Sequence, residues 1–295
     1  MKSLKVGVIG LGTMGKVIAS HIRGGGHLTA AYDRDPARYQ IFNECACADI
    51  ASLGSKCELA VLVLPDPSSV RSTMEELLSG NNRLKAVLDH STVDPETAAT
   101  VSQLCNERSL WHLQSPMFGG VRAAKERRLF LLGGGDGNVM ERFGEAIRTY
   151  APEIMPVADA WTAAAAKLVH NLVTLGNAAV AMEALVLGGR LGLSADSLLT
   201  LFARGTADSY VARNSLRRTL VDGDYSAGYQ LYLARKDLHL AGELAHSAGI
   251  SFQVLRSVMG HFDAAASADR LGTDYPTIYP DVADALSRRT EESSR

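Results

Sequence analysis

The sequence is poor in the residues that mark several protein classes. Its 295 residues include four cysteines, none in a Cys-x-x-Cys pair, which argues against a zinc site and indicates reduced thiols in a cytoplasmic protein without a signal peptide. A net charge of −2 argues against nucleic acid or a membrane surface bound through bulk charge. The longest apolar stretch, around 172–187, contains Asn177 and Glu183, so we expect no membrane span.

Residues 1–158 alternate between apolar runs and helical patterns, within a chain of ordinary globular composition, 46% hydrophobic and 21% charged. The expected strands are Val6–Ile9, Leu28–Tyr32, Leu59–Leu64, Ala86–Leu88, Trp111–Leu113 and Leu129–Leu132. The expected helices among them are Lys16–Arg23, Ser68–Leu78, Pro95–Glu107 and Gly137–Tyr150. Such alternation predicts βαβ units and an α/β Rossmann domain with a doubly wound, mostly parallel sheet.

Residues 159–295 lack convincing strands and predict an all-helical domain for substrate binding and oligomerisation. The expected helices are Ala163–Arg190, Ala195–Ala203, Ser209–Val221, Leu231–Ala248 and Ser251–Ala266. The polar end from Ser287 to Arg295 reads as a frayed tail. Small residues along Gly176–Gly189 would let a second helix approach closely, so we expect a homodimer or homotetramer.

The first expected strand ends at a glycine turn, Gly10-Leu11-Gly12-Thr13-Met14-Gly15, and a helix follows. In this context Gly10 permits the tight turn, Gly12 lets the backbone approach a pyrophosphate, and Gly15 lets the helix pack on the strand. The helix N-terminus offers free N–H groups to the phosphates. The segment therefore predicts dinucleotide binding, against the alternative of a purely structural turn.

Two further strand ends border the expected cofactor site. Asp33, about 20 residues beyond the glycine turn, stands where a Rossmann fold meets the adenosine ribose, which favours NAD. Arg34 beside it could stack on adenine or meet a 2′-phosphate, so NADP is the alternative cofactor. Asp33 also fits the role of a turn residue or helix cap before Pro36. Leu64 and Pro65 follow another strand and could also border the cofactor.

Lys167 and Asn171 are four residues apart, which places both on one face of an expected helix. A lysine among alanines and leucines is partly desolvated, and desolvation lowers its pKa toward the range useful for proton transfer. Taken alone, a lysine on a helix is usually a solvated surface charge.

Four motifs together resemble the β-hydroxyacid dehydrogenase family, typified by 3-hydroxyisobutyrate dehydrogenase and tartronate semialdehyde reductase. They span nearly the whole chain: the glycine turn with its Met, Asp89-His-Ser-Thr-Val-Asp-Pro95, Lys167-x-x-x-Asn171, and Lys236-Asp237-Leu238 followed by Leu240-Ala241. The resemblance implies an NAD(P)-dependent oxidoreductase that moves hydride between nicotinamide and a 3-hydroxy acid or semialdehyde-type carbonyl.

The resemblance also implies roles for individual residues. Lys167 looks like the general acid/base, and Asn171 like the group that holds the substrate beside it. Thr92 looks like a cofactor contact, and Lys236 like a second lysine that closes over cofactor and substrate. The plainer interpretations are an N-cap for Thr92 and a surface charge for Lys236. Ser91, in the second motif, joins the residues expected to bind substrate.

The expected substrate segment departs from the family pattern. Where the family usually carries Pro-Val-Ser-Gly-Gly, this chain has Pro116-Met-Phe118-Gly119-Gly120-Val-Arg122. The glycines still let backbone N–H groups approach a carboxylate, but a phenyl ring replaces the hydroxyl. Arg122 could compensate with a charged fork to the carboxylate. Alternatively, Phe118 marks a pocket for a larger or less polar substrate.

Two other functions are open to this sequence. One is an imine or larger-aldehyde reductase of the same fold, which Phe118 favours and Lys167 disfavours. The other is a non-catalytic dinucleotide-binding protein that uses its cleft for interaction. We expect no metal site, because His239, Glu243 and His246 share a helix face without an obvious further ligand.

Overall fold

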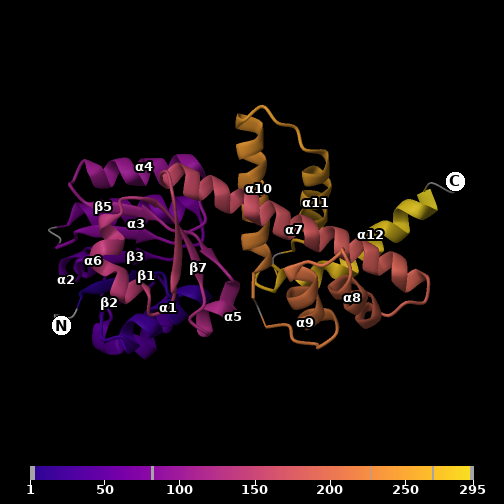
Figure 1. Ribbon diagram of the computed structural model, residues 1–295, viewed down its shortest axis with the longest axis horizontal. Coiled ribbons are helices and arrows are strands. Elements are labelled where there is room, and N and C mark those ends of the chain that lie inside the picture. The colour runs from indigo at the N-terminus through magenta and orange to yellow at the C-terminus, as the bar shows by residue number, and fades with distance from the viewer. Residues whose placement is uncertain (1–3, 81–82, 227, 268, 293–295) are drawn as a thin grey trace. The chain divides into compact units, whose positions relative to one another are not determined.

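The computed structural model describes residues 4–80, 83–226, 228–267 and 269–292 (Figure 1). The chain forms two compact units, Met1–Lys167 and Leu168–Arg295. Helix α7, Ala160–Arg190, contributes residues to both. The domain boundary expected between residues 158 and 159 falls just ahead of α7 and remains a proposal.

The first unit is built on one mixed sheet. Its strands are β1 Val6–Ile9, β2 Leu28–Tyr32, β3 Leu59–Leu62, β4 Ala86–Asp89, β5 Trp111–Gln114, β6 Met117–Phe118, β7 Phe130–Gly135 and β8 Glu153–Val157. The order is β2-β1-β3-β4-β5-β7-β6, with β8 also paired to β7. Neighbours from β2 to β5 are parallel, whereas β7 is antiparallel to β5 and β6. The expected Rossmann-type sheet is confirmed.

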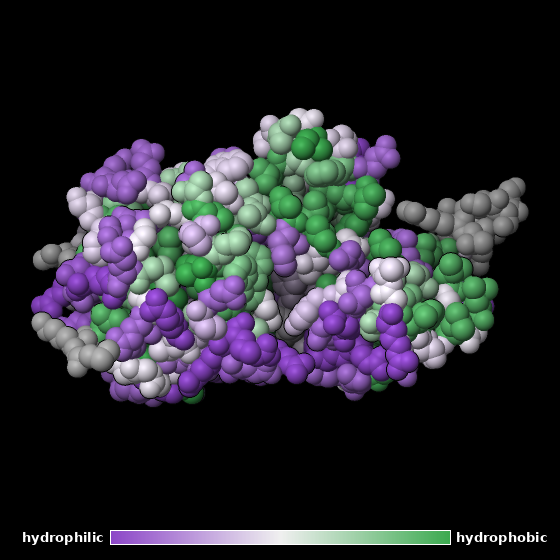
Figure 2. Space-filling view, in the orientation of Figure 1, coloured by the Kyte–Doolittle hydropathy of each residue, from purple (hydrophilic) through white to green (hydrophobic). Residues whose placement is uncertain are grey.

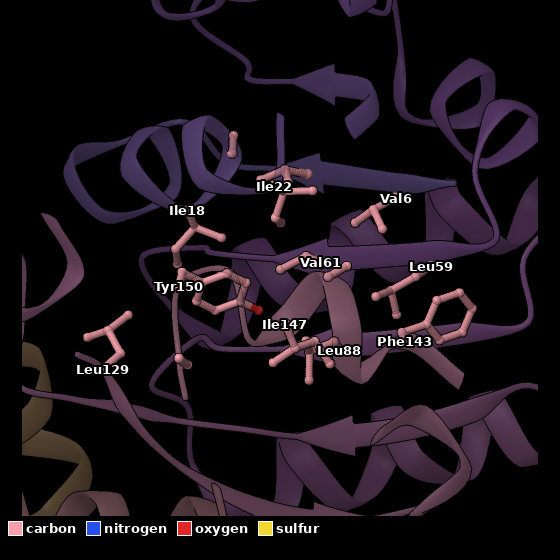
Figure 3. Packing of buried hydrophobic residues seen from close by; sticks show 14 of the residues in the cluster. Val6, Ile18, Ile22, Leu59, Val61, Leu88, Leu129, Phe143, Ile147 and Tyr150 are labelled. Atoms are coloured by element: carbon pink, nitrogen blue, oxygen red, sulfur yellow. The ribbon is translucent and has the colours of Figure 1, made fainter. Parts of the chain in front are cut away.

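Helices cover both faces of this sheet, which is why its strands read as nearly continuous apolar runs. They are α1 Thr13–Gly24, η1 Pro36–Cys45, α2 Ile50–Lys56, α3 Pro67–Ser79, α4 Pro95–Asn106, α5 Gly120–Lys125 and α6 Asn138–Ile147. On one face, side chains of α1 and α6 pack on the strands, as Figure 3 shows for Ile18, Ile22, Phe143, Ile147, Val61 and Leu88. On the other, α2, α3, α4 and the start of α7 pack together.

Aspartates begin the helices that follow β3 and β4. Asp66 accepts the N–H of Ser69 at 2.7 Å, and Asp94 accepts the N–H of Thr97 at the same distance. A proline follows each aspartate at the first turn, where its missing N–H costs no helix hydrogen bond. These caps fix where the loops after β3 and β4 end, and so hold both loops at the carboxyl edge of the sheet.

The second unit is helical, as expected. Its elements are the rest of α7, α8 Ala195–Arg204, the π-helical turn η2 Val211–Leu216, α9 Arg217–Leu220, α10 Leu231–Ser247, α11 Gln253–Ala264, η3 Tyr275–Ile278 and α12 Tyr279–Glu292. Its core joins α7, α8, α10, α11 and α12 through buried side chains such as Leu175, Met182, Leu238, Phe262 and Val282.

Two expectations about the ends of the domains were wrong. The polar end is not a frayed tail from Ser287, because α12 runs to Glu292, with Val282 buried; residues 293–295 lie outside the described residues. Strand β8 was missed because Pro156 interrupts a mostly exposed run without apolar alternation. Among the described residues, β8 pairs only with β7, and proline is tolerated in a strand that pairs on one side.

Helix α7 is the most apolar element. By length and composition alone it could cross a membrane, with a mean hydropathy of 1.6 over an 18-residue window, of which 33% is buried. Such a helix is also common as the core helix of a soluble protein, so this is weak support for a membrane span. The partial burial leaves part of α7 uncovered within its own chain.

Candidate active site

The three glycines of the turn have different surroundings. Gly10 has a φ of +92°, and a Cβ there would lie 2.3 Å from the carbonyl oxygen of Val63. A Cβ on Gly15 would lie 1.9 Å from the oxygen of Gly10. A Cβ on Gly12 would meet only Arg38 Nη1, at 3.7 Å. The first and third glycines are therefore required by the fold, whereas the space at Gly12 is open.

Helix α1 begins at this turn without any side-chain cap or acidic residue in its first turn. Its first N–H groups, around the exposed Thr13 and half-buried Met14, and its positive dipole end are thus available to an anion. The side chain of Leu11 lies in the core, with 2% exposed. This is the geometry expected of a pyrophosphate site.

Asp33 directly follows β2 and lies beside the glycine turn, as expected. Its Oδ2 accepts the N–H of Leu11 at 2.6 Å, and its Oδ1 accepts the N–H of Asp35 at 2.9 Å. Arg38 Nη1 lies 3.6 Å from Oδ2. The carboxylate therefore braces the turn, and about two of its four lone-pair sites remain for a ribose. Arg34 is exposed. Arg38 belongs to no motif that would identify it from the sequence.

The loops after β3 and β4 are tied together. The N–H of Leu64 donates to Ser91 Oγ at 3.0 Å, and Gln114 Nε2 donates to the carbonyl oxygen of Ser91 at 3.0 Å. Ser91 is buried, Thr92 is half-buried and Pro65 is exposed. The Ser91 hydroxyl thus has a clear bracing role, and its expected contact with substrate stays a prediction.

Lys167 and the substrate segment are brought together within the first unit. Lys167 Nζ donates to the carbonyl oxygen of Met117 at 2.7 Å and lies 4.4 Å from the centroid of the Phe118 ring. A cation over an aromatic face is attracted by the ring quadrupole. An ammonium group has three N–H donors, so these contacts orient the Lys167 ammonium while leaving it able to transfer a proton.

The remaining residues of the substrate segment lie at the surface. Gly119 and Gly120 are exposed and precede α5, with φ values of +111° and +66°. Arg122 has a side chain that is 75% exposed and pairs with Glu126 at 3.1 Å. Its expected contact with a substrate carboxylate would need to replace this surface pair.

Asn171 sits in a buried polar cluster of the second unit. Its Nδ2 donates to Asp237 Oδ2 at 2.7 Å and to the Tyr229 hydroxyl at 3.3 Å. Tyr229 in turn donates to Asp237 Oδ2, and Lys236 Nζ lies 3.0 Å from Asp237 Oδ1. Burial and the neighbouring Asp237 charge hold the pKa of Tyr229 well above its ordinary value. Tyr229 carried no sequence signal, and Asp237 appeared only as part of a motif.

His90 and His112 of the first unit are buried and neutral. Burial lowers the pKa of His90 and of His112 to about 4. His90 Nε2 contacts the Tyr150 hydroxyl at 2.9 Å, so His90 faces the core. All four cysteines are buried and unpaired. Among the described residues, no three His, Cys, Asp or Glu side chains are grouped as a metal would need.

Two family models cover nearly all of these elements. The NAD binding domain of 6-phosphogluconate dehydrogenase matches residues 5–158. The NAD-binding domain of NADP-dependent 3-hydroxyisobutyrate dehydrogenase matches residues 162–280. With the glycine turn and Lys167 in place, the chain belongs to the β-hydroxyacid dehydrogenase family and is an NAD(P)-dependent oxidoreductase of the hydroxyacid dehydrogenase type.

Individual relatives agree with this placement. The chain is 27% identical to 2-(hydroxymethyl)glutarate dehydrogenase of Eubacterium barkeri over 248 residues, which covers 82% of each chain. It is 25% identical to a probable 3-hydroxyisobutyrate dehydrogenase of Mycobacterium tuberculosis, over 92% of this chain and 96% of that one. The solved structure of M. tuberculosis 3-hydroxyisobutyrate dehydrogenase with L-serine shares the fold at a TM-score of 0.84 and 23% identity, over 95% and 99% of the two chains.

Two more distant similarities bear on the two alternative functions. An imine reductase from Pseudomonas sp. has the same fold at a TM-score of 0.64 and 14% identity, over 95% of this chain and 99% of that one. The cytokine-like nuclear factor N-PAC of Xenopus tropicalis is 24% identical over 93% of this chain and 52% of its own length. Fold alone therefore does not separate the chemistries, and the site residues must.

Proposed function

We propose that the protein interconverts a 3-hydroxy acid and the corresponding semialdehyde-type carbonyl, with Lys167 as the acid/base. The observation that carries this proposal is the Lys167 ammonium, held at the Met117 carbonyl and against the Phe118 ring. The bound nicotinamide supplies or accepts the hydride. Lys167 donates a proton to the carbonyl oxygen in reduction and takes the hydroxyl proton in oxidation.

The cofactor residues in this proposal are the glycine turn from Gly10 to Gly15, Asp33, Arg34, Leu64, Pro65, Thr92 and Lys236. Those for substrate are Ser91, Phe118, Gly119, Gly120, Arg122, Lys167 and Asn171. The helix caps and loop contacts at the carboxyl edge of the sheet support the residues named for the cofactor. The contacts of Lys167 support the residues named for the substrate.

The test is turnover by Lys167→Ala, followed as nicotinamide absorbance on a panel of hydroxy acids and aldehydes with both cofactors. We expect kcat to fall by about 100-fold or more, because general acid–base catalysis contributes about that much. Cofactor affinity should stay near wild type, and the exposed Lys125→Ala is the matched control. Wild-type turnover by Lys167→Ala would refute the role.

We propose NAD as the preferred cofactor. The Asp33 carboxylate supports this choice, since a 2′-phosphate would bring like charge beside it. Arg34 and Arg38 could offset that charge by pairing with the phosphate. The ratio of kcat/KM with NAD to that with NADP tests the proposal. Arg38→Ala, which removes a cation 3.6 Å from Asp33, should raise the ratio further; a wild-type preference for NADP would overturn the proposal.

We propose that the protein is a cytoplasmic homodimer or homotetramer whose interface includes α7. Val173, Val180 and Leu187 recur at seven-residue spacing on α7 and are 57%, 60% and 63% exposed. Figure 2 shows apolar surface gathered over α11 and the adjoining part of α7. Phe252, just before α11, and Val254, in its first turn, are also exposed. An exposed apolar stripe of this kind is typical of an interface between chains.

Light scattering of the eluted protein tests the assembly. Val180→Asp would place a charge in the stripe, so we expect it to lower the molar mass toward that of one chain. Ile41→Asp, at an apolar residue 45% exposed in the first unit, is the control and should leave the mass unchanged. A wild-type protein that elutes as one chain would contradict the proposal.

An imine or larger-aldehyde reductase is the second candidate function, and the Phe118 ring beside Lys167 is the observation that favours it. The same panel with cyclic imines and bulky aldehydes separates the two. Faster turnover of imines than of any hydroxy acid or its carbonyl would favour this alternative. Cofactor binding without turnover on any substrate would favour the non-catalytic protein.

A further inference from the structure

We propose that Asp237 and Tyr229 are positioning residues that hold the Asn171 amide in one orientation, with its carbonyl oxygen turned away from Asp237. The inference rests on the proposed function, because it assigns a geometry to the residue expected to hold the substrate. It depends on the polar cluster of the second unit alone.

The orientation follows from the chemistry of the partners. An ionised carboxylate can only accept hydrogen bonds, so the side of the Asn171 amide 2.7 Å from Asp237 Oδ2 must be its NH₂ group. The amide oxygen then lies on the opposite side of the amide group, where His170 Nδ1 is 3.1 Å away. An amide oxygen has two lone pairs, so it can accept from His170 and from another donor together.

Tyr229 strengthens this arrangement. Its hydroxyl donates to Asp237 Oδ2, and its raised pKa keeps it protonated at physiological pH. Its oxygen also lies 3.3 Å from Asn171 Nδ2, so it accepts from the same amide group. Lys236 occupies the other carboxylate oxygen, at 3.0 Å. With hydrogen bonds or an ion pair at each oxygen, Asp237 cannot rotate without losing several of them.

Burial makes the cluster rigid. Asn171 is 5% exposed and Asp237 is 3% exposed, so a rotated amide would leave a polar group unpaired away from water. An unsatisfied buried polar group costs about 1–3 kcal/mol, equivalent to about a 5- to 150-fold population ratio. The Asn171 oxygen is therefore fixed as a hydrogen-bond acceptor on the side away from Asp237.

The experiment compares Asp237→Asn and Tyr229→Phe with wild type, using the control Asp263→Asn on α11, whose partners are Arg235 and His239. Asparagine keeps the shape of Asp237 but can donate as well as accept, so the Asn171 amide loses its unique orientation. We expect kcat/KM for the hydroxy acid to fall by about 10-fold or more in Asp237→Asn and by less in Tyr229→Phe. In Tyr229→Phe, which leaves the Lys236–Asp237 ion pair in place, the Kd of the reduced cofactor should change by less than about twofold.

An exchange of the two side chains separates orientation from simple stability. Asn171→Asp places two carboxylates together and should lower the urea midpoint. The double variant Asn171→Asp/Asp237→Asn restores one carboxylate facing one amide, so its midpoint should recover while its kcat/KM stays low. Recovery of both would overturn the proposal, as would wild-type kcat/KM in Asp237→Asn.

Two further results would change the role assigned to this polar cluster or the function proposed for the protein. Loss of cofactor affinity in parallel with kcat/KM in Tyr229→Phe would overturn the proposal, because the cluster would then serve the cofactor site. The urea midpoints report on the interaction between Asn171 and Asp237 even if the protein turns over no substrate. Inactivity of the wild-type protein would thus count against the proposed function, whereas the absence of midpoint recovery would count against the pairing.

Discussion

The glycine turn yields a sharp prediction because its glycines face different atoms. Gly12→Ala should leave the apo fold intact and weaken dinucleotide binding, whereas Gly15→Ala should destabilise the apo fold itself. The added Cβ meets only Arg38 Nη1 at 3.7 Å in the first case, and the Gly10 carbonyl oxygen at 1.9 Å in the second. A flexible arginine end can move, but a backbone oxygen in the turn cannot.

The magnitudes follow from these contacts. Gly12 is the N-cap of α1, and alanine at an N-cap typically costs about 1 kcal/mol, within a range of about 0.5–2 kcal/mol, relative to the better capping residues. A methyl forced against backbone at residue 15 resembles an overpacked core, which costs about 1–3 kcal/mol or more. At about 2–4 °C per kcal/mol, Gly15→Ala should lower the apo Tm by about 2–12 °C.

The assay is thermal unfolding of each variant with and without reduced cofactor, together with a fluorescence titration for Kd. For Gly12→Ala we expect a Kd at least about tenfold higher, since the methyl occupies space needed by the pyrophosphate. The cofactor-dependent rise in Tm should shrink accordingly, because ligand stabilisation depends on the ratio of free ligand to Kd. For Gly15→Ala the apo Tm should fall before any ligand is added.

Either of two results would refute this reasoning. A wild-type Kd in Gly12→Ala would mean that phosphate does not approach the backbone there. An unchanged apo Tm in Gly15→Ala would mean that α1 does not pack on the turn as closely as the Gly10 oxygen implies. Gly26→Ala is a useful comparison, because its φ of +76° strains alanine with no atom within 4 Å of the added Cβ.

Further predictions concern substrate choice, pH and thiol reactivity. Phe118→Ser should raise the kcat/KM of small hydroxy acids relative to bulky ones; an unchanged ratio would contradict its role in specificity. Because the pKa of His90 and of His112 is about 4 in the folded protein and near 6.5 when unfolded, the unfolded state binds more protons between these values. The free energy of unfolding should therefore fall as pH drops from about 6.5 to 4, by about 3 kcal/mol per histidine, and His112→Phe should fall less steeply in urea titrations. Burial raises the pKa of Cys57 and Cys105 to about 12, so native protein should react slowly with iodoacetamide and unfolded protein quickly; rapid native labelling would contradict their burial.

Most of the fold could be predicted from the sequence, because the hydrophobic pattern of its strands and helices is strong. The expected strands at Val6–Ile9 and Leu28–Tyr32 match β1 and β2 residue for residue, and each is followed by a turn residue, Gly10 or Asp33. The long helix was placed within three residues of its observed start at Ala160. These elements are specified by local hydrophobic runs, which do not depend on distant contacts.

Other elements depend on distant partners and could not be read locally. Strand β6 has only two residues, Met117 and Phe118, and exists because β7 pairs with it. Helix α12 has few apolar residues, and its buried Val282 joins a core built from α7 to α11. In the candidate site, the motifs identified the residues that remain predictions, whereas Arg38 and Tyr229 act through contacts with residues distant in sequence.

The contacts of Lys167 are compatible with both proposals made for it, a role as the acid/base and a substrate shaped by Phe118. Strand β6 pairs Met117 with Leu131 and Phe118 with Phe130, so one short strand supplies both the carbonyl and the ring that meet the ammonium. A backbone carbonyl is present whatever the side chain, so replacing the family's usual serine by Phe118 does not remove the hydrogen bond that orients Lys167. The replacement removes a hydroxyl and adds apolar volume beside it, supported by the Phe130 ring at 5.6 Å. We therefore expect the proton-transfer step to resemble that of the serine-bearing relatives, and the difference to lie in which acid fits against the ring.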